Sequence, residues 1–481
     1  MVHKSLLGIF WSFVDRISGQ LISFVIGIVL ARLLTPNDYG LIGILTIFIN
    51  LSNVFIESGF SNALIRKLGR SDYDLATAFY FNIAIGLIAY FILFIISPYI
   101  SGYFNSHILC DLLRIVGLSV LFNSLCIVQN AIITADLNTK LLTKINIFSQ
   151  LPMGGVAIVL AYNNFGVYSL AIQFVGGSLL RTILYWWYAK WFPTVGFKKK
   201  SFDYLWGFGS KLVAANLIGT VFNEIYSVVI GKCVGKQELG YYAKARSLSV
   251  QPDTICTGII QKVTVPIFSF IQNDKFQLLT EYRKYTRMIL CLMSPLSIFL
   301  IVCGKPLILV LWGEQWEGAV MLFQLLVFAG LWSPISTLNL TLLQVLNRTG
   351  FMLRLEFFKK FFSILIIAIS IPGGIVGIVV GQIFIAIIAD VINMRASKLL
   401  INYEYSSQIK DILFYLLPAL GIGGITMYIT LYIETAWISI VLSCGIIYSL
   451  YLLYLYLMRD IAYFYFINIC SKIYNRYVQK K

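Results

Sequence analysis

Eleven polar and charged residues inside four apolar stretches of the chain have the types and the spacing to recognise a polar ligand. They are Asp15, Arg16 and Gln20; Asn50, Asn53 and Glu57; Asn216, Asn223 and Glu224; and Arg246 and Asp253. A helix turns by about 100° per residue, so each group shares one face of its helix, with Glu224 at the edge of its group. Ionisable groups in apolar surroundings are costly unless they face protein or water, and they therefore mark candidate functional sites.

Two interpretations of these polar faces follow from helix chemistry. Either the polar groups line a cavity, or they join helices through hydrogen bonds. For the asparagines and the neighbouring serines and threonines both interpretations stay open. For Arg16, Arg246 and Asp253 the cavity is favoured, because a charge tolerates dry packing less well than a neutral group does.

The amino-acid composition indicates whether these helices belong to a soluble protein or to a membrane protein. The 481-residue chain is 59% hydrophobic and 12% charged, with a mean hydropathy of +0.83, whereas soluble domains are about 45–50% apolar and about 25% charged. A polytopic membrane protein is predicted. The net charge of +16 does not indicate nucleic acid, because the basic residues lie mainly between apolar stretches. The scattered cysteines, the two histidines and the lack of a GxxxxGK[ST] motif predict no metal, no cofactor and no ATP hydrolysis.

Fourteen apolar stretches approach the length of about 20 residues that a spanning helix needs. They centre on residues 9–31, 40–58, 76–97, 112–134, 143–161, 166–189, 206–231, 239–268, 287–311, 319–345, 356–371, 374–394, 412–432 and 436–457. Prolines 252, 266, 295 and 334 lie inside these stretches and are expected to kink or break helices. The basic residues outside the stretches divide 26 to 4 between the two sides, which predicts that both termini are cytoplasmic. The loops are too short for a nucleotide-binding or extracytoplasmic domain.

A repeat at an offset of 200 residues indicates a duplicated protein. Residues 30–40, LARLLTPNDYG, and residues 230–240, IGKCVGKQELG, each combine a helix end, a basic residue, a polar turn, an acid and a glycine. The same offset superposes the first two polar faces on the last two. Such parallel repeats are typical of many transporters. We expect a six-helix bundle over 1–200, a second over 201–400, two extra transmembrane helices over 401–458 and a basic amphipathic cytoplasmic tail over 459–481.

Several short motifs, in order, resemble one family of membrane proteins. They are LARLLTPNDYGLIG and SGFSNALIR, then VIGKCVGKQELGYYAKARSLSVQP, KVTVPIFS, LWGEQW and LNRTG. Together they resemble bacterial polysaccharide transporters, the Wzx-like O-antigen and exopolysaccharide flippases of the multidrug/oligosaccharidyl-lipid/polysaccharide superfamily. The similarity is to the subgroup with colanic acid and teichuronic acid exporters, and it covers nearly the whole chain.

The resemblance implies a fold and an activity. The fold would be two six-helix bundles in a V shape followed by two extra spans. The activity would be translocation of undecaprenyl-diphosphate-linked oligosaccharide across the bacterial cytoplasmic membrane, with spans 1, 2, 7 and 8 lining the cavity. Those spans carry the four polar faces. The expected partners are the lipid-linked substrate, membrane lipids and the polymerase and assembly proteins of cell-surface polysaccharide biosynthesis.

The hypothesis that follows is alternating access by a transporter and not an enzyme. Arg16 and Arg246 attract the diphosphate, and Gln20 and the asparagines bind sugar hydroxyls. Asp253 or Glu57 is the candidate for coupling to H+ or Na+. The alternatives are a multidrug exporter of the same superfamily, a membrane polysaccharide polymerase or glycosyltransferase, and a scaffold of an assembly complex. The short outer loops argue against the enzyme.

Overall fold

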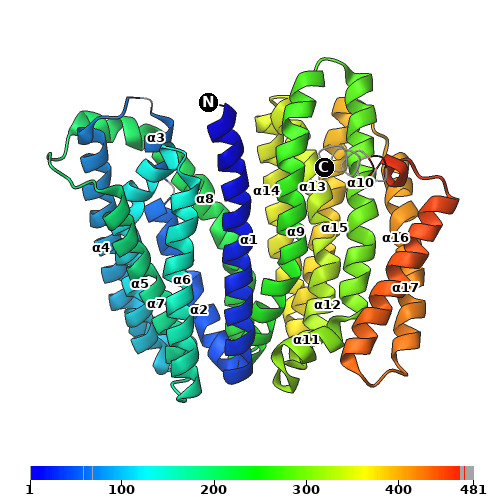
Figure 1. The fold of residues 1–481 in the computed structure, drawn as a ribbon, viewed down its shortest axis with the longest axis horizontal. Helices are drawn as coiled ribbons and strands as arrows, with labels where there is room; N and C mark the ends of the chain where they lie inside the picture. Colours follow the sequence, from blue (N-terminus) through cyan, green and yellow to red (C-terminus); the bar gives the residue numbers. More distant parts are fainter. Residues whose placement is uncertain (1, 58, 68, 466–467, 469–470, 472–481) are drawn as a thin grey trace, which may run out of the picture. The chain divides into compact units, whose positions relative to one another are not determined.

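The computed structural model describes the chain except residues 1, 58, 68, 466–467, 469–470 and 472–481, and gives no side-chain description for residues 2–17 and 57 (Figure 1). Every regular element among these described residues is a helix, α or 3₁₀. The prediction of an all-α polytopic membrane protein with about fourteen transmembrane helices is confirmed. The predicted tail, 459–481, lies mostly outside the described residues.

Packing divides the chain into two compact units, Met1–Ala243 and Lys244–Lys481, and the boundary falls inside α9 (Lys236–Ile271). The first unit holds α1 (Val2–Leu33), α2 (Pro36–Glu57), α3 (Phe60–Arg66), α4 (Asp72–Tyr103), α5 (Ile108–Ala135), α6 (Thr139–Tyr162), α7 (Val167–Ala189) and α8 (Lys199–Cys233). Helix α8 packs on α2, α3 and α4. The expected bundle boundary near residue 200 stays a prediction.

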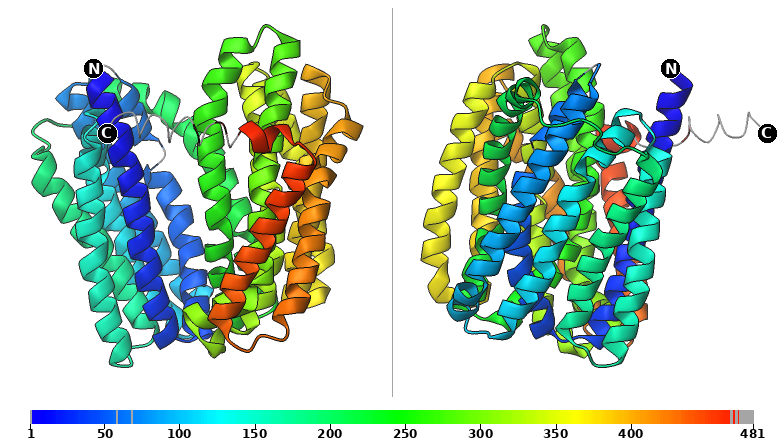
Figure 2. Two further views of the ribbon diagram at one scale, coloured as in Figure 1. Left: turned by 45° about the vertical axis from the view of Figure 1, so that its right-hand side comes forward. Right: turned by 90° about the vertical axis from the view of Figure 1, so that its left-hand side faces the viewer.

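The second unit holds the rest of α9 and the helices that follow it. These are α10 (Lys275–Val302), α11 (Gly304–Trp312), η1 (Glu314–Trp316), α12 (Gly318–Gly330), α13 (Ser333–Val345), α14 (Thr349–Ser370), η2 (Ile371–Gly373), α15 (Gly374–Ile401), α16 (Tyr405–Thr430) and α17 (Ala436–Leu457). Figure 2 shows these long helices from two further sides.

The helices correspond to the predicted spans, with three local differences. Twelve segments of the described chain are long and apolar enough to cross a membrane. One of them, Thr349–Ile401, contains both α14 and α15. Helix α1 is not among the twelve, because only its shorter apolar part, Ser18–Leu33, is fully described. The predicted span 287–311 is two helices, which meet at Cys303. The predicted span 319–345 breaks between Gly330 and Ser333, where Pro334 cannot donate a backbone hydrogen bond. The short α3 was predicted as loop.

The two glycines of the sequence repeat meet in the first unit. A Cβ atom on Gly40 would lie 1.8 Å from the carbonyl oxygen of Lys236, and one on Gly240 would lie 1.8 Å from that of Pro36. Each contact maps onto the other at the 200-residue offset. Only glycine allows two helix backbones to approach this closely. The repeated turn therefore specifies a symmetric crossing of the N-terminal turns of α2 and α9.

A buried carboxylate fastens the helices of the second unit. Asp411 of α16 accepts hydrogen bonds from Arg283 Nε at 2.6 Å and from Arg287 Nη2 at 2.9 Å, both on α10. The Tyr403 hydroxyl also donates to Asp411. Burial, and then the hydrogen bond to Asp411, raise the pKa of Tyr403, so the hydroxyl keeps its proton and remains a donor. Leu278, Tyr282, Leu338, Leu342 and Tyr451 belong to the surrounding apolar core.

Candidate functional site

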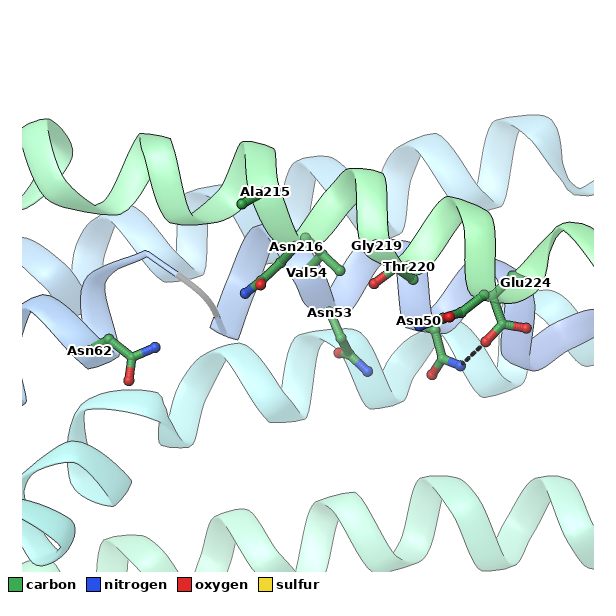
Figure 3. Close-up of a pocket in the computed structure, with 10 residues that line it drawn as sticks. Asn50, Asn53, Val54, Asn62, Ala215, Asn216, Gly219, Thr220 and Glu224 are labelled. Atoms are coloured by element: carbon green, nitrogen blue, oxygen red, sulfur yellow. Dashed lines mark hydrogen bonds between the residues drawn. The ribbon is translucent and has the colours of Figure 1, made fainter. Parts of the chain in front are cut away.

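A polar cavity of about 680 Å³ lies between α2, α3 and α8 in the first unit (Figure 3). Its lining is dominated by amides and small side chains. The lining residues are Asn50, Asn53, Val54, Asn62, Ala215, Asn216, Gly219, Thr220, Asn223 and Glu224. All ten of these described residues belong to the first unit.

Helical spacing brings these side chains onto facing surfaces. Asn50 and Asn53 lie one turn apart on α2, and Asn216, Thr220 and Asn223 follow the i, i+4, i+7 spacing of one face of α8. The two helices pack against each other. Between these amides α8 carries Gly219, where an added Cβ would meet no atom within 4 Å. The absence of a side chain there leaves room for a ligand.

Two hydrogen bonds orient the α2 amides. Asn50 Nδ2 donates to Glu224 Oε1 at 3.0 Å, the bond that Figure 3 draws between α2 and α8. Asn53 Oδ1 accepts from Nδ2 of Asn123 on α5 at 3.3 Å. These bonds leave the carbonyl oxygen of Asn50 and the amide nitrogen of Asn53 for a ligand. A preoriented acceptor and a preoriented donor thus lie one helical turn apart.

The charge of the lining decides what kind of ligand fits. Of the ten described residues in the lining, only Glu224 is ionisable. Each of the five asparagines offers an acceptor oxygen and a nitrogen with two donor hydrogens. Hydroxyl groups also donate and accept, so an amide-lined cavity matches a polyhydroxylated ligand better than a bare anion.

The structure brings together five of the eleven residues singled out in the sequence. Asn50, Asn53, Asn216, Asn223 and Glu224 line the cavity. Their role in binding stays a prediction.

Three of the other six, Gln20, Arg246 and Asp253, are not among the described residues that line it. Gln20 lies on α1, which packs against α6, and Arg246 and Asp253 belong to the second unit. The side chains of Asp15, Arg16 and Glu57 lie outside the described residues. In the second unit, the buried Oδ1 of Asp253 has no hydrogen-bond partner among the described residues.

Two residues of the site were not predicted from the sequence. Asn62 is on α3, a helix of seven residues that is too short to produce a hydropathy signal, although it lies within the motif SGFSNALIR. Asn123 is a single amide in an apolar stretch with no periodic partner. Only its tertiary contact with Asn53 identifies it.

Comparison with known proteins gives a family and a fold. The profile of the family described as "Polysaccharide biosynthesis protein" matches residues 29–321. The chain is similar to the teichuronic acid biosynthesis protein TuaB of Bacillus subtilis, with 24% identity over 58% of this chain and 58% of that protein. It is also similar to the lipopolysaccharide biosynthesis protein WzxC of Escherichia coli, with 23% identity over 81% of this chain and 80% of that protein. The succinoglycan biosynthesis transport protein ExoT of Rhizobium meliloti is 22% identical over 68% of this chain and 66% of that protein.

Solved structures share the fold at low sequence identity. The lipid II flippase MurJ, in an inward closed conformation, superposes with a TM-score of 0.73 and 19% identity, over 95% of this chain and 99% of that one. An inward-facing multidrug transporter of the MATE family gives a TM-score of 0.60 and 16% identity, over 79% and 95%. Together with the match over residues 29–321, these observations confirm the resemblance found in the sequence, and the chain belongs to the polysaccharide biosynthesis protein family.

Proposed function

We propose that this chain is a flippase that carries undecaprenyl-diphosphate-linked oligosaccharide from the cytoplasmic to the outer leaflet of the bacterial inner membrane. The transport would supply O-antigen, capsule or exopolysaccharide biosynthesis. Support comes from the family, from relatives named for polysaccharide biosynthesis, and from the fold shared with a lipid II flippase. The polymerase and assembly proteins that use such a substrate are its proposed partners.

The amide-lined cavity is the observation that carries the proposal. Five asparagines and Thr220 supply paired donors and acceptors inside a membrane-spanning unit, where sugar hydroxyls would otherwise lose their bonds to water. The volume of about 680 Å³ accommodates a small part of an oligosaccharide and not a whole polymer. We assign the cavity to sugar residues of the head group.

The mechanism proposed for the substrate is alternating access. The head group enters from the cytoplasm while the lipid tail stays in the bilayer, and Arg16 and Arg246 attract the diphosphate. Asp253 or Glu57 couples the cycle to H+ or Na+. The orphaned Oδ1 of Asp253 supports that residue as a proton or cation acceptor. The charge bias of the loops supports cytoplasmic termini.

A multidrug exporter is the principal alternative, because a multidrug transporter shares the fold. Sites for drug-like molecules are lined mainly by hydrophobic and aromatic side chains. Among the ten lining residues that the structure describes, only Val54 and Ala215 have hydrocarbon side chains, and none is aromatic. This lining supports a glycan substrate over a lipophilic drug.

A flipping assay on the purified protein in vesicles tests the proposal. The rate at which a fluorescent lipid-linked oligosaccharide becomes accessible to a membrane-impermeant quencher is compared among variants. Asn50→Ala and Asn216→Ala each remove one or two hydrogen bonds to sugar, which we expect to slow transport roughly three- to tenfold. The matched control is Asn273→Ala, in the exposed turn between α9 and α10. Translocation by the cavity variants at the rate of the control would show that the site is misassigned.

The charged residues form a second arm of the same assay. Arg16→Ala and Arg246→Ala should slow translocation of the diphosphate-linked substrate without abolishing folding. Wild-type rates in both variants would exclude these arginines as diphosphate ligands. Efflux of lipophilic cations with no translocation of glycolipid would instead establish the multidrug alternative.

A further inference from the structure

A groove of about 360 Å³ on the second unit combines an apolar wall with two arginines. It runs between α14 and α15 and ends at the start of α16. The lining residues are Phe351, Arg354, Leu355, Phe358, Phe362, Val391, Ile392, Arg395 and Tyr405. Of these, Arg354 comes from α14 and Arg395 from α15.

Neither arginine has a counter-ion among the residues that the structure describes. Arg354 and Arg395 make no hydrogen bond or ion pair with any described residue, whereas Arg283 and Arg287 in the same unit share Asp411. Two carboxylates near them in the sequence pair with lysines instead. Glu356 pairs with Lys359, and Glu404 pairs with Lys398 at 3.0 Å. Two guanidinium groups therefore converge on the groove with their hydrogen-bond donors unused.

The two arginines lie at the same end of a helical hairpin. Arg354 is in the second turn of α14 and Arg395 in the last two turns of α15, and the hairpin turns at η2, at its other end. The loop charges predict that the arginine end faces the cytoplasm. A site at that end of the hairpin would lie near the phosphates of the cytoplasmic leaflet.

The wall of the groove is apolar and exposed. Phe358 is 60% and Val391 51% exposed, and the adjoining Phe361 is 65% exposed. In a protein with many membrane-spanning helices, such side chains lie against acyl chains. A ligand that fits is thus a lipid whose tail follows α14 and whose head group carries negative charge.

We propose that this groove is a binding site for an anionic phospholipid of the cytoplasmic leaflet, with its phosphate held by Arg354 and Arg395. Guanidinium groups bind phosphate oxygens bidentately. Two positive charges favour a head group that adds no positive charge of its own. A zwitterionic lipid would place its ammonium group beside them, which like-charge repulsion disfavours. The site is separate from the amide-lined cavity and does not depend on the glycan that the protein carries.

Lipid titration of the full-length protein tests this assignment. Native mass spectrometry in detergent measures binding of phosphatidylglycerol and of phosphatidylethanolamine with the same acyl chains. Wild type should prefer phosphatidylglycerol. The double variant Arg354→Gln, Arg395→Gln should bind it roughly tenfold more weakly, and each single variant should bind it about threefold more weakly. Both side chains are exposed and have no partner among the described residues, so an unchanged circular dichroism spectrum is expected and would establish that the variants fold.

The matched control has the same net charge. Arg348 and Arg459 are exposed and do not line the groove. Arg348→Gln, Arg459→Gln should keep the affinity of wild type. If both double variants bound phosphatidylglycerol equally weakly, the effect would come from general surface charge, and the assignment of the site would be overturned. Equal binding of the two lipids by wild type would also overturn it. If undecaprenyl diphosphate bound in place of phosphatidylglycerol, and required the same arginines, the groove would belong to the transport substrate and the proposal would fail.

Discussion

The glycine crossing of α2 and α9 offers a direct test of the link between the sequence repeat and the fold. In Gly40→Ala, the new Cβ atom would lie 1.8 Å from the Lys236 carbonyl oxygen and 2.7 Å from its carbon. Both atoms are backbone in the first turn of α9, so no side chain can rotate away. The helices must separate, or one turn must unwind.

The expected cost follows from that distance. A carbon approaches a carbonyl oxygen no closer than about 3.3 Å, so the contact must open by about 1.5 Å. Overpacking of this kind costs about 1–3 kcal/mol, and a rigid backbone neighbour places the cost at the upper end. Alanine in place of a helical glycine stabilises the helix by about 1 kcal/mol, because alanine has the higher helix propensity, and this offsets part of the cost. We expect a net destabilisation of about 2 kcal/mol, which lowers the unfolding temperature of a unit this size by about 4–8 °C.

Thermal unfolding of the purified protein, followed by intrinsic fluorescence in one detergent, measures the effect. Gly240→Ala should behave like Gly40→Ala, because its Cβ would lie 1.8 Å from the Pro36 carbonyl oxygen. The double variant should cost less than the sum, since one separation of the helices relieves both contacts. Gly155→Ala on α6, where an added Cβ meets nothing within 4 Å, is the matched control. If Gly40→Ala unfolded at the temperature of that control, the crossing would not be as close as described.

Three further substitutions test packing elsewhere. Asp411→Asn leaves the guanidinium groups of Arg283 and Arg287 with no carboxylate. Because these side chains are 43% and 25% exposed, water compensates in part, and we expect a loss of about 2 kcal/mol of stability. A lower unfolding temperature would show this loss, and an unchanged temperature would contradict the pairing. Trp186→Phe removes the bond from Nε1 to the Leu125 carbonyl oxygen at 2.9 Å, which should cost about 1 kcal/mol in a denaturant titration, with Trp187→Phe, on the exposed face, as the control. Gly86→Ala would place the new Cβ 2.6 Å from the Ser124 Cβ, which should cost about 1–3 kcal/mol and lower the resistance to limited proteolysis. Adding Ser124→Gly should restore most of that resistance. No rescue would show that the two positions do not touch.

The amino-acid sequence by itself determined the class of protein and the position of its helices. Bilayer thickness sets the length of an apolar span, and backbone groups in lipid must bond within one helix, so hydropathy alone locates the spanning segments. The repeat around Gly40 and Gly240 was also readable, because a turn with this composition recurs at a fixed offset. So were the amides of the cavity on α2 and α8, because residues that share a helix face keep a fixed spacing.

The tertiary structure alone decided which polar groups meet. Asn53 pairs with Asn123 across 70 residues, and Arg283 with Asp411 across 128 residues, and no local pattern encodes such contacts. Helix breaks at Cys303 and before Pro334 divided two apolar runs that hydropathy read as continuous. The groove with Arg354 and Arg395 was equally invisible, because the sequence shows both arginines as ordinary basic residues of the predicted cytoplasmic side. These two arginines form a candidate site because packing of α14 against α15 brings both to one groove, where neither has a counter-ion among the described residues.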